Sequence, residues 1–262
     1  MASTSGPDTS GSGDIVRTLH LLWDTGKRPS RGPKPGLTLD RIVEAAIQIA
    51  DTEGLEAVSM RRLSTELGTG TMSLYRYVPG KGELLDLMLD RVQRPGDEAA
   101  LGEDWRATLA ALGRETLALY RRHPWLLQVN QTRPVLGPGA VESLELVLAR
   151  IKDMGLTDPE LISAIVMIEG YVVGAARTQL YGKEAERKSG LTDAEFWGAQ
   201  TPVLEKVLAT GRYPVLASLS DDAFSYDFDH FEFGLQRILD GLESLVARRG
   251  KAAGSEARRG KE

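Results

Sequence analysis

Between Ser59 and Lys81 lies a group of side chains suited to hydrogen bonding and stacking. Helical spacing places Leu74 and Val78 on one side of a short segment and turns the polar side chains to the other. These polar residues are Thr71, Ser73, Tyr75, Arg76 and Tyr77. Phenols, hydroxyls and a guanidinium together supply the donors, apolar contacts and stacking surfaces that read base edges and phosphates in a DNA major groove. The segment therefore predicts a DNA-reading face.

A helical hairpin whose aromatic side chains fill a core is the alternative interpretation. Tyr75 and Tyr77 are two residues apart, so both cannot lie on one buried helical face, and the spacing argues against that alternative. Basic residues flank the segment on both sides and add attraction for phosphates. The predicted DNA-contacting residues in this part of the chain are Arg61, Arg62, Thr71, Met72, Ser73, Tyr75, Arg76, Tyr77 and Lys81.

Two short helices joined by a tight turn would position this face. Ser59 is suited to cap the first helix, in which Leu63 and Leu67 lie four residues apart. The run 68–70, Gly-Thr-Gly, interrupts the pattern, and a second helix is predicted over 71–77. This arrangement is typical of a helix-turn-helix.

Several further motifs surround the predicted turn. A helix ends at Glu53-Gly54, a hydrophobic-Ser-x-Arg-x-Leu pattern spans 58–63, the block Leu-Tyr-Arg-Tyr-Val occupies 74–78, and Lys81 precedes Leu84-Leu85. On these motifs the stretch from about 37 to 92 resembles the N-terminal domain of the tetracycline-repressor (TetR) family of bacterial transcription regulators. Gly70 and Gly80 stand where the family often has serine. Glycine is an acceptable helix cap, so the change costs only a few tenths of a kcal/mol.

The resemblance implies a homodimeric repressor. In the family, an effector bound in the C-terminal domain changes the separation of the two reading heads and releases the operator. Residues 170–177 and 210–214 also look like parts of the effector domains of actinobacterial TetR-type proteins, a less specific resemblance. The alternative is a DNA-binding dimer without a small-molecule effector, whose second domain serves dimerisation or a protein partner.

The net charge of −5 does not argue against DNA binding once it is divided along the chain. Residues 1–94 contain twelve basic and twelve acidic residues, so the whole excess lies in the remainder. Between residues 59 and 81 four basic residues face a single acid, Glu66. Local charge of this kind decides phosphate affinity.

Composition limits the remaining function classes. The chain has no cysteine, which excludes disulfides and thiolate zinc sites. The first fourteen residues lack the basic and apolar regions of a secretory signal, and no uncharged apolar run approaches about 20 residues. We therefore expect a cytoplasmic protein with no membrane span.

We expect four regions: a flexible N-terminal extension over 1–36, a helix-turn-helix domain over 37–94, an effector-binding and dimerisation domain over 95–249, and a disordered tail over 250–262. Residues 1–13 are mostly Ser, Gly and Thr and should be disordered. A short amphipathic helix follows over 14–23. The stretch 27–36 is either a solvated linker or an arm that enters the minor groove; its candidate contacts are Arg28, Arg31 and Lys34.

Every other periodic segment is helical, so the fold class is all-α. Helices are expected over 38–53, 83–92, 105–120, 141–154, 158–176, 192–209 and 229–249, with a charged loop over 181–190. The segment 161–176 is apolar nearly all round except for Glu169, and Gly170, Gly174 and Gly234 would allow close approach of helices. Either one subunit buries these faces, or the helices near 160–180 and 229–249 pair in a homodimer as a four-helix bundle.

No catalytic or cofactor motif stands out. His20, His123 and His230 are scattered and lack ligands at metal-binding spacing, so neither an enzyme nor a metal site is expected. The second half does contain residues typical of a cavity between helices, although core packing is the simpler interpretation of each one. The candidate effector contacts are Trp125, Gln128, Asn130, Met154, Met167, Glu169, Tyr171, Arg177 and Trp197. Glu169 is the leading candidate, because an acid in an apolar helix requires a partner.

Overall fold

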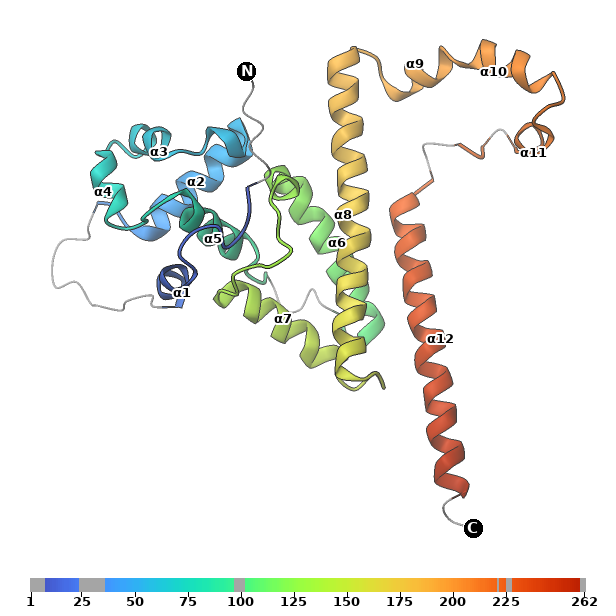
Figure 1. The fold of residues 1–262 in the computed structure, drawn as a ribbon. Coiled ribbons are helices and arrows are strands. Elements are labelled where there is room, and N and C mark those ends of the chain that lie inside the picture. Colours follow the sequence, from blue (N-terminus) through green and yellow to red (C-terminus); the bar gives the residue numbers. More distant parts are fainter. Residues whose placement is uncertain (1–7, 24–35, 97–101, 221, 225–227, 260–262) are drawn as a thin grey trace.

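The computed structural model describes residues 8–23, 36–96, 102–220, 222–224 and 228–259. Within these ranges every regular element is helical, which confirms the predicted all-α fold. The β pairing found there is an isolated bridge between Thr9 and Asn130. A group of short helices lies beside a group of longer ones, as Figure 1 shows. We call these groups the head and the body.

The head consists of α2 (Leu39–Glu53), η1 (Leu55–Ala57), α3 (Met60–Glu66), α4 (Thr71–Tyr75) and α5 (Lys81–Val92). Both predicted caps are confirmed: the Thr38 hydroxyl accepts from the Arg41 N–H at 3.2 Å, and the Ser59 hydroxyl from the Arg62 N–H at 3.1 Å. Gly68, with φ of 61°, forms the turn between α3 and α4. The helix-turn-helix is therefore confirmed, although α4 ends at Tyr75 and not at 77.

Apolar side chains at helical spacing make the core of the head. The fully buried ones include Ile42, Ile49, Leu63, Leu74, Val78, Leu84 and Met88. Each helix of the head contributes one face to this core, so α4, only five residues long, is held by its neighbours and not by its own hydrogen bonds.

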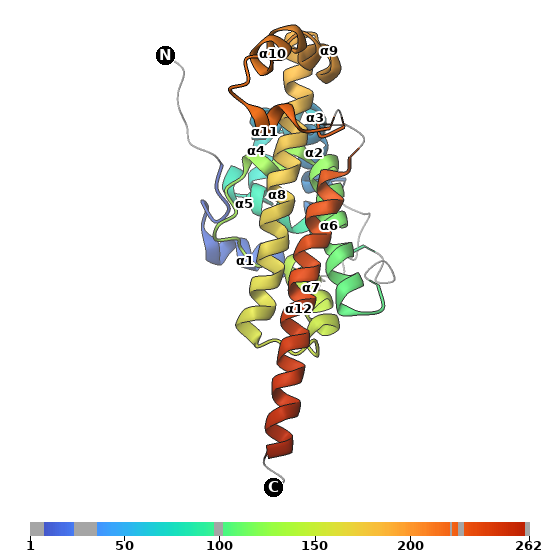
Figure 2. The same ribbon diagram turned by 90° about the vertical axis from the view of Figure 1, so that its right-hand side faces the viewer.

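The body contains α6 (Trp105–Arg122), η3 (Pro124–Gln128), α7 (Pro138–Ile151), α8 (Asp158–Ser189) and α12 (His230–Arg259). The two longest helices, α8 and α12, lie side by side in both views (Figures 1 and 2). Gly113 of α6 allows α12 to approach, because a Cβ there would lie 3.0 Å from a methyl carbon of Leu235. The body core includes Leu109, Ile151, Ile168, Val172, Leu235 and Leu239.

Head and body share apolar packing. Trp125, Leu126 and Val129, at and just after η3, belong to the same buried cluster as the head helices. The Trp125 indole N–H also donates to the Asp51 carboxylate of α2 at 2.8 Å. A rotation of the head against the body would have to disturb these contacts.

Three predicted boundaries in the body were wrong. The expected loop over 181–190 is the end of α8, where Glu184 and Lys188 pair one turn apart and Gly190 ends the helix at φ of 70°. The expected helix over 192–209 is two, α9 (Asp193–Gly198) and α10 (Thr201–Leu208), because Pro202 cannot continue α9. The expected disordered tail is helical to Arg259, since Ala, Arg, Glu and Lys favour helix.

Residues 8–13 also differ from the prediction of disorder. They run along α5 and are hydrogen-bonded to it and to the segment 130–135. The amphipathic helix expected over 14–23 is present as α1 (Ile15–Trp23), which buries Thr18 and Leu22 against the head. The predicted arm residues Arg28, Arg31 and Lys34 lie outside the described residues.

Two of the regions that expose large apolar side chains lie in the body. The segment with α9, α10 and α11 (Pro214–Ala217) extends beyond the end of α8 and exposes residues such as Phe196, Trp197 and Leu204 (Figure 1). On α8, Ile162, Val166 and Met167 are exposed, and Cβ atoms at Gly170 and Gly174 would meet nothing. A second copy of the chain would cover such surfaces.

The close approach at Gly234 occurs within one chain and not between subunits. A Cβ at this position would lie 2.1 Å from the Tyr171 hydroxyl, so the glycine makes room for Tyr171 between α8 and α12. At Gly234, therefore, the alternative of burial within one subunit holds, and a role of this glycine in contact across a dimer is wrong.

By length and composition α8 could cross a membrane, and among the described residues it is the one helix that could. This is weak support for a span, because the central helix of a soluble protein passes the same test. Here α8 packs against α6, η3 and α12.

Candidate DNA-binding surface and effector cavity

The outer face of α4 carries the predicted reading residues. Leu74 and Val78 are fully buried, as expected, and hold the helix on the head. Met72 is 74% exposed and Tyr75 44% exposed, while Thr71 and Ser73 are half-buried beside them. An exposed helix face with apolar, hydroxyl and aromatic groups can contact thymine methyls, base edges and phosphates.

Positive charge at this face comes from Arg61 and Arg76. Both side chains are exposed, and no ion pair involves them among the described residues. Their guanidinium groups are therefore available for phosphates.

Two other predicted DNA contacts, Tyr77 and Arg62, have partners within the protein. The Tyr77 hydroxyl donates to the Leu37 carbonyl at 3.0 Å, and its ring packs on the head core. Arg62 bridges Glu53 at 2.6 Å and Glu66 at 2.8 Å; these hydrogen bonds raise the pKa of Arg62 and lower that of Glu53. These two side chains stabilise the head, which makes them weaker candidates for DNA contact.

Lys81, at the first position of α5, pairs with Asp8 at 3.0 Å. The ammonium can still reach a phosphate, because about two-fifths of its side chain is exposed. Contact with DNA would then compete with Asp8.

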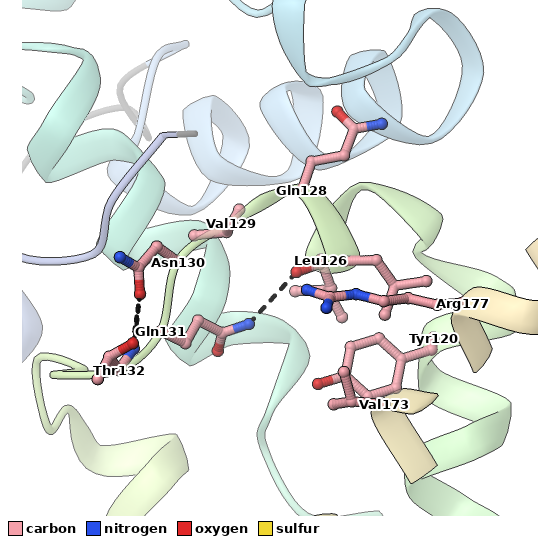
Figure 3. Close-up of a pocket in the computed structure, with 10 residues that line it drawn as sticks. Tyr120, Leu126, Gln128, Val129, Asn130, Gln131, Thr132, Val173 and Arg177 are labelled. Carbon is pink, nitrogen blue, oxygen red and sulfur yellow. Dashed lines mark hydrogen bonds between the residues drawn. The ribbon is translucent and has the colours of Figure 1, made fainter. Parts of the chain in front are cut away.

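A cavity of about 450 Å³ lies in the body beside the head. Its wall is formed by Tyr120 of α6, the stretch 126–132, and Val173 and Arg177 of α8. This volume lies in the range of small-molecule sites. Figure 3 shows the Arg177 guanidinium and the Tyr120 ring on one side and the amides of Asn130 and Gln131 on the other.

Hydrogen bonds fix part of the polar wall. The Asn130 amide oxygen accepts from the Thr132 hydroxyl at 2.6 Å and from its N–H at 3.0 Å. The Gln131 amide donates to the Leu126 carbonyl at 3.5 Å and accepts from Gln93, at the end of α5, at 3.1 Å. One wall residue is thus bonded directly to the head.

Desolvation and nearby charges shift the pKa values of two side chains at or near the cavity. Burial, and next the Glu169 carboxylate, raise the pKa of Tyr120, while Arg177 opposes them, so the phenol is a neutral donor near pH 7. Desolvation raises the pKa of Glu169, and no partner of this carboxylate is recorded among the described residues. The cavity therefore offers a cation, a phenol and several amides to a ligand.

Of the nine predicted effector contacts, Gln128, Asn130 and Arg177 line the cavity. Met154 and Trp125 belong to the core, and Tyr171 stacks on Phe231 and donates to backbone carbonyls of α12. The remaining three, Met167, Glu169 and Trp197, are partly or largely exposed and do not line it.

Sequence reasoning missed most of the cavity wall. The missed residues are Tyr120, Leu126, Leu127, Val129, Gln131, Thr132 and Val173. Val173 could have been found from Arg177, since the two lie one helical turn apart. The irregular stretch 129–132 carries no periodic signal. Within the described ranges no group of His, Asp or Glu could hold a metal ion.

The helix-turn-helix with its exposed α4, joined to a helical body, defines a DNA-binding transcription regulator. Comparison with known families agrees. Residues 42–88 match the N-terminal domain described as "Bacterial regulatory proteins, tetR family", and residues 98–246 match "Tetracyclin repressor-like, C-terminal domain". The chain belongs to the TetR family and is a transcriptional repressor of it; regulators of this family dimerise and bind operator DNA.

Individual relatives support this assignment. The chain is 76% identical to the HTH-type transcriptional repressor DrrR1 of Streptomyces coeruleorubidus over 94% of this chain and 92% of that protein. It is 30% identical to an HTH-type transcriptional regulator of Saccharopolyspora erythraea, over 86% and 92%. Among solved structures, ActR of Streptomyces coelicolor in complex with actinorhodin superimposes with a TM-score of 0.66 at 32% identity, covering 81% of this chain and 97% of that one.

Proposed function

We propose that the protein binds its operator through the outer face of α4 and that a small molecule in the body cavity releases it. The observation that carries this proposal is the pairing of an uncovered reading face with a cavity whose wall is bonded to α5. The similar ActR binds actinorhodin. The cavity fits a ligand that accepts hydrogen bonds, because Arg177, Tyr120 and the amides can donate to it.

On the DNA side, we assign base contacts to Thr71, Met72, Ser73 and Tyr75. Arg61, Arg76 and Lys81 would hold phosphates, since their charges are exposed or only weakly paired. The segment with Arg28, Arg31 and Lys34 stays a proposed minor-groove arm.

For the assembly, we propose that α8 and α12 pair with their copies in a partner subunit. The exposed Ile162, Val166 and Met167, together with the open surface at Gly170 and Gly174, support this interface. We keep the division near residue 94 between a DNA-binding domain and an effector domain, with shared packing at Trp125. The protein would act in the cytoplasm and carry out no catalysis.

Fluorescence anisotropy with DNA from upstream of the protein's own gene tests the reading face. We expect Tyr75→Ala to weaken specific binding at least tenfold and Tyr75→Phe, which keeps the ring, to weaken it less. Unchanged affinity of a folded Tyr75→Ala variant would contradict the assignment.

The same complex, titrated with actinorhodin as a first probe, tests the cavity. Release of DNA by the wild type but not by Arg177→Leu would support an effector site there. If neither this nor related compounds bind, the alternative of a dimer without an effector is favoured.

A further inference from the structure

Residues Asp8 to Asp14, here called the strap, lie between the cavity wall and α5. On the wall side, the Asn130 N–H donates to the Asp8 carbonyl at 2.8 Å and the Asn130 carbonyl accepts from the Ser10 N–H at 3.1 Å. The Ser10 hydroxyl accepts from the Val135 N–H at 3.2 Å. The strap is therefore paired with both ends of the stretch 130–135.

On the other side the strap is bonded to α5. The Ser10 hydroxyl donates to the Asp86 carboxylate at 2.7 Å, and the Gly11 N–H donates to both oxygens of that carboxylate, at 3.1 and 3.2 Å. The Asp14 N–H donates to Glu83 at 3.1 Å. Ser10 thus connects the two sides: its N–H donates to Asn130 of the wall, and its hydroxyl donates to Asp86 of α5.

These contacts are closely packed and largely shielded from water. Ser10 is 6% exposed and Asp86 2% exposed, so the carboxylate depends on the strap for its hydrogen bonds. A Cβ at Gly13 would lie 2.7 Å from the Glu83 carboxyl, and one at Gly82 would lie 2.9 Å from the Gly13 nitrogen. The segment fits α5 too closely to be an incidental contact.

The strap contacts two separate sites, the cavity wall and α5. Asn130 and Thr132 line the cavity, whereas α5 begins at Lys81, six residues after the end of α4. The strap lies outside both matched family regions, 42–88 and 98–246. It lies at the junction where the cavity meets the head.

We infer that the strap is a positioning element that couples the cavity wall at 130–132 to α5 and hence to the reading face of α4. The inference rests on the proposed operator binding. The strap is a further connection between body and head, in addition to the direct hydrogen bonds between Gln93 and Gln131 and between Asp51 and Trp125. Coupling between sites is reciprocal, so operator binding must change the affinity of the cavity for a ligand by the same factor as that ligand changes operator affinity.

Hydrogen exchange of the full-length protein, with and without operator DNA, measures this coupling without any effector. The readout is the change in exchange of the peptide 126–134 when operator is added. For each variant we compare the change in exchange rate when operator is added, and not the rate without operator, because loss of the strap by itself exposes the Asn130 amide. Deletion of residues 1–13 removes most of the strap, and deletion of residues 1–7 is the matched control that keeps it. Ser10→Ala removes only the connecting hydroxyl.

We expect operator to slow exchange in this peptide about fivefold or more in the wild type and in the 1–7 deletion, the lower end of usual coupling between sites. In Ser10→Ala and the 1–13 deletion the change should fall below about twofold while operator is still bound. If the strap is merely structural, its loss will lower the melting temperature and leave the operator-induced change in exchange intact. That result would overturn the inference. So would a wild type whose exchange in this peptide does not respond to operator. If the 1–13 deletion does not fold, Ser10→Ala decides. Failure of the wild type to bind DNA would instead refute the proposed function.

Discussion

Met72 gives the sharpest test of the proposal that the outer face of α4 reads DNA. Its side chain is the most exposed of the large apolar groups on the head, so its own chain leaves most of it uncovered. A thioether on the groove-facing side of a recognition helix is suited to apolar contact with the methyl group of thymine. We predict that Met72→Ala weakens operator binding and removes discrimination between thymine and uracil at one position.

The magnitude follows from the exposure. Since Met72 is 74% exposed, DNA can bury at most about three quarters of the side chain. Full burial of a methionine contributes about 1.5–3 kcal/mol, so truncation should cost about 1–2 kcal/mol. That corresponds to a loss of roughly 5- to 30-fold in affinity. One thymine methyl contributes about 0.8 kcal/mol, or about fourfold.

The assay is a double-mutant cycle by anisotropy at one fixed salt concentration. Each operator thymine is replaced in turn by deoxyuridine, and each DNA is titrated with wild type, Met72→Ala and Met72→Leu. One position should show the fourfold loss with wild type and Met72→Leu but not with Met72→Ala. If the loss persists in Met72→Ala, or if no thymine shows it with the wild type, Met72 does not read a methyl group.

Three further predictions concern the head, the cavity and the assembly. Tyr77→Phe should lower the free energy of unfolding by about 1 kcal/mol, because the Leu37 carbonyl loses its donor, with little change in base preference; altered preference would return Tyr77 to the reading face. Desolvation raises the pKa of the Glu169 carboxyl, so the folded state binds its proton more tightly and is destabilised as pH rises above about 4. Glu169→Gln should therefore raise the melting temperature at pH 7 but not at pH 4, and Glu115→Gln on α6 is the control. Val166→Lys should yield monomers by light scattering, and an unchanged dimer mass would place the interface elsewhere.

Local features of the fold could be predicted from the sequence because neighbouring residues determine them. A hydroxyl before a helix, as at Thr38 and Ser59, needs only the next turn for its hydrogen bond. Leu63, Leu74 and Val78 face inward because of spacing alone. The same local rules identified the outer face of α4.

The cavity and the roles of single tyrosines depend on residues far apart in the chain. Tyr77 and Tyr171 both looked available for ligands, yet each donates to a carbonyl at least 40 residues away. Residues 8–13 looked disordered, because a Ser- and Gly-rich composition says nothing about the acceptors it will meet. One signal was present: Asp86 and Asp90 interrupt a leucine-rich stretch, and acids on a buried face require donors from elsewhere.

The acids of α5 connect the head to segments that are distant in the sequence. Asp86 accepts from the strap, Glu83 accepts from the N–H of Asp14 just before α1, and Asp90 accepts from Gly139 and Ala140 at the start of α7. Burial raises the pKa values of Asp86 and Asp90, and the donated N–H groups oppose that rise. Because α4 rests on the same core as α5, we expect the orientation of α4 to depend partly on these segments. Ser10→Ala, which removes a side-chain donor to Asp86, should therefore change operator affinity from outside the head.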